Sequence, residues 1–241
     1  MSSSQPPSHQ EDLSTLDTIG QSDHYQRETH QQQTKNASTA PRSVTYTITT
    51  ELLSSPYSLS PEAYLAANPS ITDIIGSAAV FYHPQPHSQH QPRLLLIQRS
   101  PHDFFPLKWE LPGGSVDRGA GGDSSLVAGA VRELREETGL EAVRVVRWVA
   151  TREFPEGDGV RTWRQVIFEV EIDGTEAGQE EGMGGPRVRL DPEEHVDYRW
   201  VTAEEVREGR TGEVVLEDAG PEWRAVLKGA FEMYGVKEEN L

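Results

Sequence analysis

Residues 132–140 read RELREETGL, and this short segment says more about the chemistry of the 241-residue chain than any other. On an α-helix, Glu133, Glu136 and Glu137 are spaced i, i+3 and i+4, so their carboxylates share one face. Carboxylates this close repel one another, and a hard divalent cation that prefers oxygen ligands removes the repulsion. Magnesium is the natural candidate. The alternative is a solvated helix with a charged surface face, which is the commoner origin of such a charge run.

The neighbouring residues favour a helix with a defined start and end. Apolar residues at helical spacing form a stripe distinct from the acidic face and predict a helix over residues 124–138. Ser124 or Asp123 can cap its start, and Gly139 is the residue that a helix C-terminus prefers. Before it, a short aromatic strand over residues 109–111 runs into a Pro-Gly-Gly turn. This context lowers the weight of the surface-helix alternative.

These segments resemble the signature of the Nudix hydrolase family, G-x5-E-x7-R-E-U-x-E-E-x-G-U, in which U is aliphatic. The second half matches without a substitution at residues 132–140, and the first half is present as LPGGSVD, residues 111–117. Seventeen residues lie between Gly114 and Arg132 where the signature has thirteen, so four are extra. We place them in the flexible run of residues 119–122.

The extra residues displace the first glutamate of the signature. Counted back from the signature arginine it falls on Ser124, and counted forward from the signature glycine it falls on Ala120. The nearest carboxylates are Asp117 and Asp123. We interpret the change as a loop variation, because the family's first glutamate is usually less critical than the later three. A weakened or lost activity is the alternative.

The resemblance implies a divalent-metal site on the helix. Glu133, Glu136 and Glu137 would be its ligands, the backbone carbonyl of Gly113 would be a further ligand, and Arg132 would orient the carboxylates. The metal implied is Mg²⁺, with Mn²⁺ as a substitute.

The family often recruits one more carboxylate from a loop before a late strand that ends in tryptophan. In this chain that strand carries Trp200, and residues 191–195 precede it. We choose Glu194, with Glu193 and His195 as second choices. An exposed loop acid is an equal alternative, because acidic side chains are mostly exposed.

The reaction that the resemblance implies is metal-assisted hydrolysis of the diphosphate linkage of a nucleoside diphosphate joined to another moiety. Metal ions neutralise pyrophosphate oxygens and lower the pKa of a bound water. A carboxylate, one of the helix glutamates or Glu194, takes the proton as general base. The catalytic candidates are therefore Glu136, Glu133 and Glu194, with Arg132 orienting the carboxylates. A nucleoside triphosphate, ADP-ribose, a dinucleoside polyphosphate and a damaged nucleotide all stay open as substrates.

Three residues are candidates for substrate binding. Arg99, at the end of its strand, could contact phosphate or be a surface charge. Phe105 and Trp109 could stack on a base, as could Phe104, but aromatic residues near a strand are more often core.

Further elements surround this segment. Apolar runs predict strands over residues 74–82, 93–99, 143–150, 165–172 and 198–201, and a last helix over residues 221–234. The strands and helices lack regular alternation, so the fold class expected is α+β. The resemblance, which covers roughly residues 72 to 235, implies a Nudix-type α/β/α sandwich with a mixed sheet.

Three regions follow along the chain. Residues 1–43 are Ser/Gln/His-rich and predict a disordered tail. Residues 44–71 read as an N-terminal strand and helix extension, with Ser60 as a helix cap. Residues 72–241 form the predicted Nudix hydrolase domain.

Composition excludes several function classes. The net charge of −17 disfavours binding to nucleic-acid polymers and to anionic membranes. The absence of cysteine excludes disulfides and thiolate metal sites. No apolar run can cross a bilayer, and we expect an intracellular, cytoplasmic protein by default, with the nucleus open. Many family members dimerise, so a homodimer stays open as well.

Two further functions compete with a hydrolase. The first is a catalytically weakened Nudix-fold module that binds nucleotides or regulates a partner. The second is an acidic scaffold whose tail binds partners. Loss of metal-dependent hydrolysis in Glu136→Gln distinguishes the enzyme from the module, and deletion of residues 1–43 tests the scaffold.

Overall fold

The computed structural model describes residues 45–83, 91–156, 159–173, 185–217 and 221–236. The predicted tail, residues 1–43, lies outside the described residues, as do residues 84–90 and 174–184. Among the helices that are described, none is long and apolar enough to span a membrane.

An eight-stranded mixed sheet forms the centre of the domain. Its strand order is β1-β6-β7-β2-β3-β4, with β5 paired to β2 and β8 paired to β3. The β1–β6 and β2–β7 pairs are parallel and the other pairs are antiparallel. The strands are β1 (Thr47–Ile48), β2 (Asp73–Tyr82), β3 (Arg93–Arg99), β4 (Trp109–Glu110), β5 (Gly113–Ser115), β6 (Ala142–Pro155), β7 (Thr162–Ile172) and β8 (His195–Val201).

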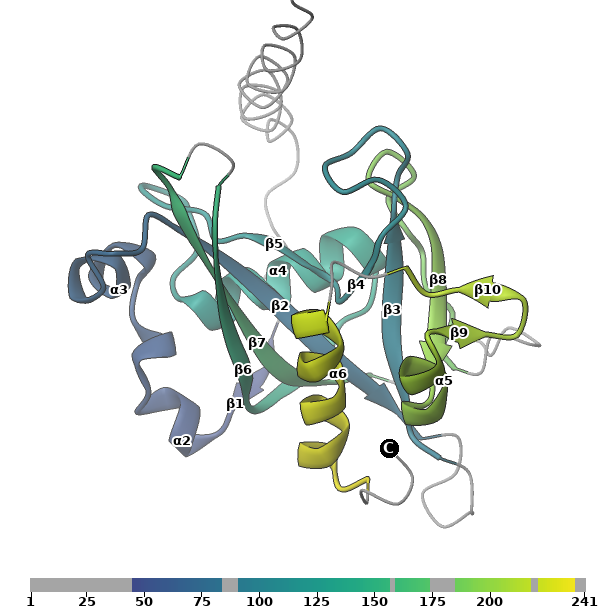
Figure 1. Cartoon of the computed structure of the whole chain (residues 1–241). Helices are drawn as coiled ribbons and strands as arrows, with labels where there is room; N and C mark the ends of the chain where they lie inside the picture. Colours follow the sequence, from purple (N-terminus) through teal and green to yellow (C-terminus); the bar gives the residue numbers. More distant parts are fainter. Residues whose placement is uncertain (1–44, 84–90, 157–158, 174–184, 218–220, 237–241) are drawn as a thin grey trace, which may run out of the picture. The chain divides into compact units, whose positions relative to one another are not determined.

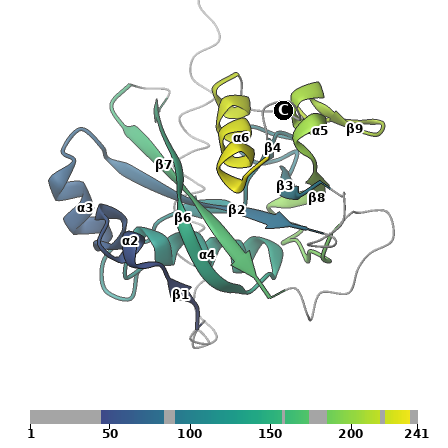
Figure 2. The ribbon, with the colours of Figure 1, turned by 90° about the horizontal axis from the view of Figure 1, so that it is seen from below.

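Helices cover both faces of this sheet. Helix α4 (Leu126–Thr138) packs on one face and α6 (Pro221–Tyr234) on the other, as Figures 1 and 2 show. Each face has its own apolar cluster, one with Leu126 and Leu134 of α4 and one with Leu227 and Phe231 of α6. The predicted α+β sandwich with a mixed sheet is therefore confirmed.

Smaller elements complete the domain. They are α2 (Thr50–Leu53), the 3-10 helix η1 (Pro56–Ser58), α3 (Pro61–Ala67), α5 (Ala203–Glu208), β9 (Arg210–Thr211) and β10 (Val214–Val215). Ser60 caps α3 as predicted, and Thr202 caps α5 in a capping box with Glu205. Leu52 and Tyr64 join the α4 cluster, so the N-terminal extension packs onto the same core.

Two predicted details were wrong. The N-cap of α4 is Ser125, whose side chain accepts from Ala128 N, rather than Ser124 or Asp123. The Asp123 carboxylate is already engaged by Arg132 and is not free to cap. Strands β6 and β7 also run longer than predicted, because they pair with each other from Ala142 to Pro155 through several bulges.

Candidate active site

The Pro-Gly-Gly turn brings strand β5 against helix α4. A Cβ atom at Gly114 would lie 2.6 Å from the carboxylate carbon of Glu133, so a larger residue there would displace this carboxylate. The backbone N–H of Gly113 donates to Glu137 Oε2 at 2.6 Å. Gly139, at φ 68°, ends the helix just after these glutamates. The turn thus holds two acidic side chains of α4 in place, while the predicted ligand role of the Gly113 carbonyl stays a prediction.

Acidic side chains from two elements gather beside this turn. One ligand atom each from Glu137, Glu194 and His195 lie within 4.8 Å of one another. Glu133 belongs to the same neighbourhood, because Glu194 and Glu137 both interact with it electrostatically. The predicted Glu194 and its alternative His195 are therefore brought together with the α4 glutamates, whereas Glu193 is exposed.

The pKa values of these acids show how crowded the negative charge is. Burial, opposed by Arg132 and reinforced by Glu136, raises the pKa of Glu133 to about 7. Burial, Glu133 and Glu110 together raise the pKa of Glu137 well above its usual range. Buried carboxylates without a cation are costly, and a divalent cation with oxygen and imidazole ligands would relieve the cost. The donor set therefore fits a divalent metal ion.

Arg132 lies at the edge of this group with every donor direction in use. Its Nε and Nη2 donate to Asp123 at 3.1 and 3.0 Å, and its Nη1 donates to Glu133 at 2.9 Å and to Glu136 at 2.8 Å. The Ser115 carbonyl accepts a further bond at 2.8 Å. Arg132 thus contacts two of the predicted ligands, Glu133 and Glu136. The Glu136 side chain is 56% exposed and lies outside the three-residue group described above.

The stretched loop supplies a carboxylate to Arg132. Asp123 is 6% exposed, and its Oδ2 also accepts the backbone N–H of Asp117 at 2.7 Å. The Asp123 N–H donates to the Asp117 carbonyl at 3.1 Å. The Gly122 N–H donates to the Gly119 carbonyl at 3.1 Å, so the extra residues form a tight turn. Asp117 itself is 3.9 Å from Arg132 and half exposed. Asp123 therefore supplies a carboxylate partner to Arg132 from the segment in which the signature has its first glutamate.

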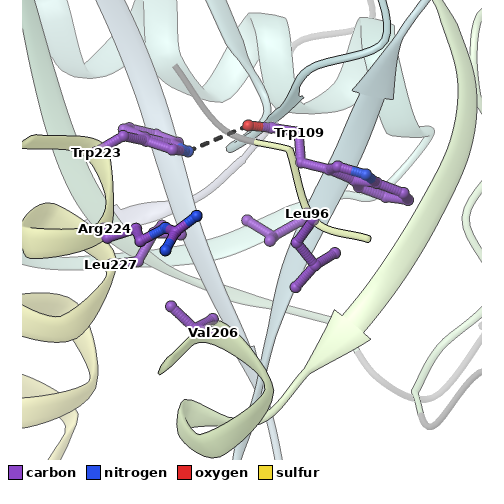
Figure 3. Close-up of a pocket in the computed structure, with 7 residues that line it drawn as sticks. Leu96, Trp109, Val206, Trp223, Arg224 and Leu227 are labelled. Atoms are coloured by element: carbon purple, nitrogen blue, oxygen red, sulfur yellow. Dashed lines mark hydrogen bonds between the residues drawn. The ribbon is translucent and has the colours of Figure 1, made fainter. Parts of the chain in front are cut away.

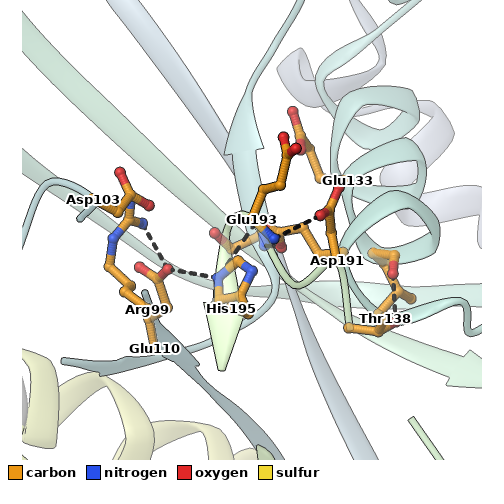
Figure 4. Close-up of polar contacts among 12 residues, drawn as sticks. Arg99, Asp103, Glu110, Glu133, Thr138, Asp191, Glu193 and His195 are labelled. Atoms are coloured by element: carbon orange, nitrogen blue, oxygen red, sulfur yellow. Dashed lines mark hydrogen bonds and ion pairs between the residues drawn. The ribbon is translucent and has the colours of Figure 1, made fainter. Parts of the chain in front are cut away.

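Glu110 was not among the residues predicted for the site. Its Oε1 lies 3.2 Å from His195 Nε2 and accepts from Arg99 Nη1 at 2.6 Å. His195 Nε2 also lies 3.8 Å from Glu137 Oε1, so Arg99, Glu110, His195 and Glu137 form one series of contacts, most of it visible in Figure 4. The Ser100 N–H donates to the Glu194 carbonyl. Nothing in the local pattern around Trp109 and Glu110 predicts these long-range partners.

The three candidates for substrate binding lie in different environments. Arg99 donates to Glu110, to Asp103 Oδ2 at 2.5 Å and to the Phe104 carbonyl at 2.5 Å, so its guanidinium is already occupied. Trp109 is 1% exposed and belongs to the α6-side core, which is the alternative that the sequence left open. Phe105 is 50% exposed, at a positive φ of 56°. Phe105 is thus the more exposed of the two aromatic candidates, and its ring contacts that of Phe104, with the centroids 4.3 Å apart.

Comparisons with known proteins show what this chain is similar to. The family model of the NUDIX domain matches residues 78–219. A MutT protein from Methanosarcina mazei Go1 is 23% identical, with a TM-score of 0.48, over 70% of this chain and 98% of that chain.

Two further solved structures are similar to the same degree. The NUDIX domain of Shewanella oneidensis NrtR, complexed with ADP ribose, is 21% identical, with a TM-score of 0.48, over 72% of this chain and 98% of that chain. A C. elegans Ap4A hydrolase is 17% identical, with a TM-score of 0.46, over 68% and 98%. The match to the NUDIX domain model over residues 78–219 decides the family.

Proposed function

The chain belongs to the NUDIX domain family and is a Nudix-type pyrophosphohydrolase, and we propose that it hydrolyses the diphosphate linkage of a nucleoside diphosphate joined to another moiety. The observation that carries this proposal is the meeting of Glu133, Glu137 and Glu194 with His195 beside the Pro-Gly-Gly turn. Buried acids destabilise the fold unless a cation neutralises them. A diphosphate is a substrate that such a cation can bridge to the carboxylates.

The residues of the acidic cluster have separate roles in this proposal. Glu137 and Glu194 would hold the metal ion together with Glu133, and His195 offers a nitrogen ligand. A divalent cation in this place, Mg²⁺ or Mn²⁺, would neutralise diphosphate oxygens and lower the pKa of the attacking water. Arg132 fixes Glu133 and Glu136 in single orientations through charge-assisted hydrogen bonds.

A carboxylate of the same cluster accepts the proton of the attacking water. Glu133 is the first candidate base, because it belongs to the acidic cluster and Arg132 holds its carboxylate at 2.9 Å. Glu194 is the alternative base. The water oxygen bonds to phosphorus, the bond from phosphorus to the bridging oxygen breaks, and the products are a nucleoside monophosphate and the phosphorylated second moiety.

The intact Arg132–Asp123 pair bears on the competing module hypothesis. The module was suggested by the stretched first half of the signature, but Asp123 supplies the carboxylate that this half lacks. Arg132, itself held by Asp123, can therefore keep the carboxylates of this helix in place, as an active site requires. This favours the enzyme over the weakened module.

A substrate panel tests the proposal. Full-length protein is incubated with ADP-ribose, a nucleotide sugar, a dinucleoside polyphosphate and a nucleoside triphosphate, with Mg²⁺ or with excess chelator, beside Glu137→Gln. We expect cleavage of at least one substrate by wild type with Mg²⁺, no cleavage with chelator, and cleavage slower on the order of 10³-fold with the variant. Nucleotide binding without cleavage by wild type would overturn the enzyme and favour the binding module.

A further inference from the structure

Three arginines lie around the acidic cluster, and they differ in how their charge is used. Arg132 and Arg99 each donate to at least two carboxylates, which raise the pKa of both guanidinium groups. Arg152, on strand β6, has no hydrogen bond or ion pair from its side chain to any residue that the structure describes. Burial lowers the pKa of Arg152, and Glu222 and Glu110 oppose this only through space.

Aromatic rings hold the Arg152 guanidinium. Its Cζ lies 5.2 Å from the ring centroid of Phe154 and 5.1 Å from that of Trp223. Stacking on ring faces fixes a guanidinium but leaves its in-plane N–H groups unsatisfied. A partly buried cation in this state is costly, so the arrangement points to an anionic group that completes it.

The contacts of Trp223 connect Arg152 to the acidic cluster. The indole Nε1 of Trp223 donates to the Trp109 carbonyl at 3.1 Å, as Figure 3 shows. Glu110 follows Trp109 directly, and its charge acts on Arg152 and on Glu137 alike. Arg152 therefore lies on the α6 side of Glu110, while the candidate metal ligands lie on the α4 side.

We propose that Arg152 is the phosphate-binding arginine of the substrate site, and that its open guanidinium edge binds a phosphate oxygen of the nucleoside diphosphate group. This rests on the proposed function, since it assumes a substrate with a diphosphate. The acids around Glu137 would repel such a group, and Arg152, which the charge of Glu110 reaches as it reaches Glu137, adds to the attraction that the metal ion provides. Arg99 already donates to Glu110, Asp103 and the Phe104 carbonyl, so we do not assign the phosphate to it.

Binding and turnover are measured separately to test this. Full-length wild type, Arg152→Met and Arg152→Lys are titrated calorimetrically with the α,β-methylene analogue of ADP in Mg²⁺, which binds but cannot be cleaved at the linkage. Met keeps the apolar stem without the charge, and Lys keeps the charge without the fork. Arg144→Met is the matched control, because Arg144 lies on the same strand with an exposed ion pair to Glu171 at 3.7 Å.

We expect Arg152→Met to weaken analogue binding about 10- to 100-fold, the usual worth of hydrogen bonds to a charged group. Lys should recover part of the affinity, and Arg144→Met should bind like wild type. With a cleaved substrate, Arg152→Met should raise KM by a similar factor and leave kcat within about threefold. Calorimetric Mn²⁺ binding should be unchanged, because the metal ligands are separate residues.

Other outcomes separate the two proposals. If Arg152→Met lowers the melting temperature but leaves analogue affinity and KM unchanged, Arg152 only joins α6 to the sheet and the inference is wrong. If wild type binds the analogue through Arg152 but cleaves no substrate, the proposed function fails while the inference stands. If wild type does not bind the analogue, the inference is overturned.

Discussion

Arg132, on α4, and Arg152, which packs against Trp223 of α6, have opposite kinds of surroundings. Arg132 donates to Asp123, Glu133, Glu136 and a backbone carbonyl, so its surroundings are complete. Arg152 stacks on Phe154 and Trp223 and donates to none of the residues described around it. On the α4 side, groups of the protein satisfy all donors of the arginine, and the acids there imply a metal ion. On the α6 side, the guanidinium of Arg152 has N–H groups left to bind a ligand.

This difference separates two tasks of one site. A saturated arginine positions catalytic carboxylates, and its loss should reduce kcat. An unsaturated arginine contributes binding energy to the substrate, and its loss should mainly raise KM. We expect each variant to change either kcat, through the α4 side, or KM, through the α6 side. A variant that changes both to the same extent would contradict this division.

The largest effect is expected at Glu137. Glu137→Gln removes the charge at the centre of the α4 side, and kcat/KM should fall on the order of 10³-fold, about 4 kcal/mol of transition-state stabilisation. Glu204→Gln, an exposed acid of α5, is the matched control and should behave like wild type. Steady-state hydrolysis with Mg²⁺ measures both. A Glu137→Gln enzyme that keeps full activity would remove this acid from the mechanism.

A smaller loss of activity is expected when Arg132 loses its carboxylate partner Asp123. Asp123→Asn should lower kcat about 10- to 100-fold with KM little changed, because it releases the arginine that orients Glu133. Asp117→Asn makes the same chemical change on a half-exposed neighbour 3.9 Å from Arg132 and should lower kcat less than twofold, by about the worth of a surface ion pair. Equal effects of the two variants would mean that Asp123 has no special role.

Arg99→Met sharpens the contrast with Arg152. It leaves Glu110 and Asp103 without their cation, so we expect a melting temperature lower by roughly 5 °C. KM should stay within about threefold of wild type, because no phosphate contact is lost. Thermal unfolding and steady-state kinetics on the same preparation check both expectations. A KM that rises as much as in Arg152→Met would restore Arg99 as the phosphate-binding residue.

The smallest effect concerns the N-terminal segment. Deleting residues 1–43 should change kcat/KM less than about twofold, because every residue of the candidate site lies after Ile71 and terminal segments tolerate change. The deletion variant is assayed beside the full chain at equal concentration. A complete loss of activity would favour the scaffold hypothesis.

The α4 side could be predicted from sequence because its chemistry is local. Glu133 and Glu137 belong to one helix, and helical spacing alone places them on one face. The Pro-Gly-Gly turn that packs against them can also be recognised from its residue types. Even there, the different burial of Glu136 and Glu137 depends on packing, which spacing does not reveal.

The α6 side could not be predicted in the same way because its contacts are distant in sequence. Trp223 reaches Arg152 from 71 positions further along the chain, and Glu110 meets His195 across 85 positions. The residue type at Arg99 suggested a phosphate contact, but its neighbours Asp103 and Glu110 occupy it. Whether an arginine is free or saturated is a property of the folded surroundings and not of the strand that bears it.

The central claim is that the buried acids beside the Pro-Gly-Gly turn are a divalent-metal site. Calorimetric titration of the full-length protein with Mn²⁺, for wild type, Glu137→Gln and Glu204→Gln, tests it most directly. The account predicts saturable binding to wild type and to Glu204→Gln, and at least about tenfold weaker binding to Glu137→Gln. Equal Mn²⁺ affinity in all three proteins, or none in wild type, would contradict it.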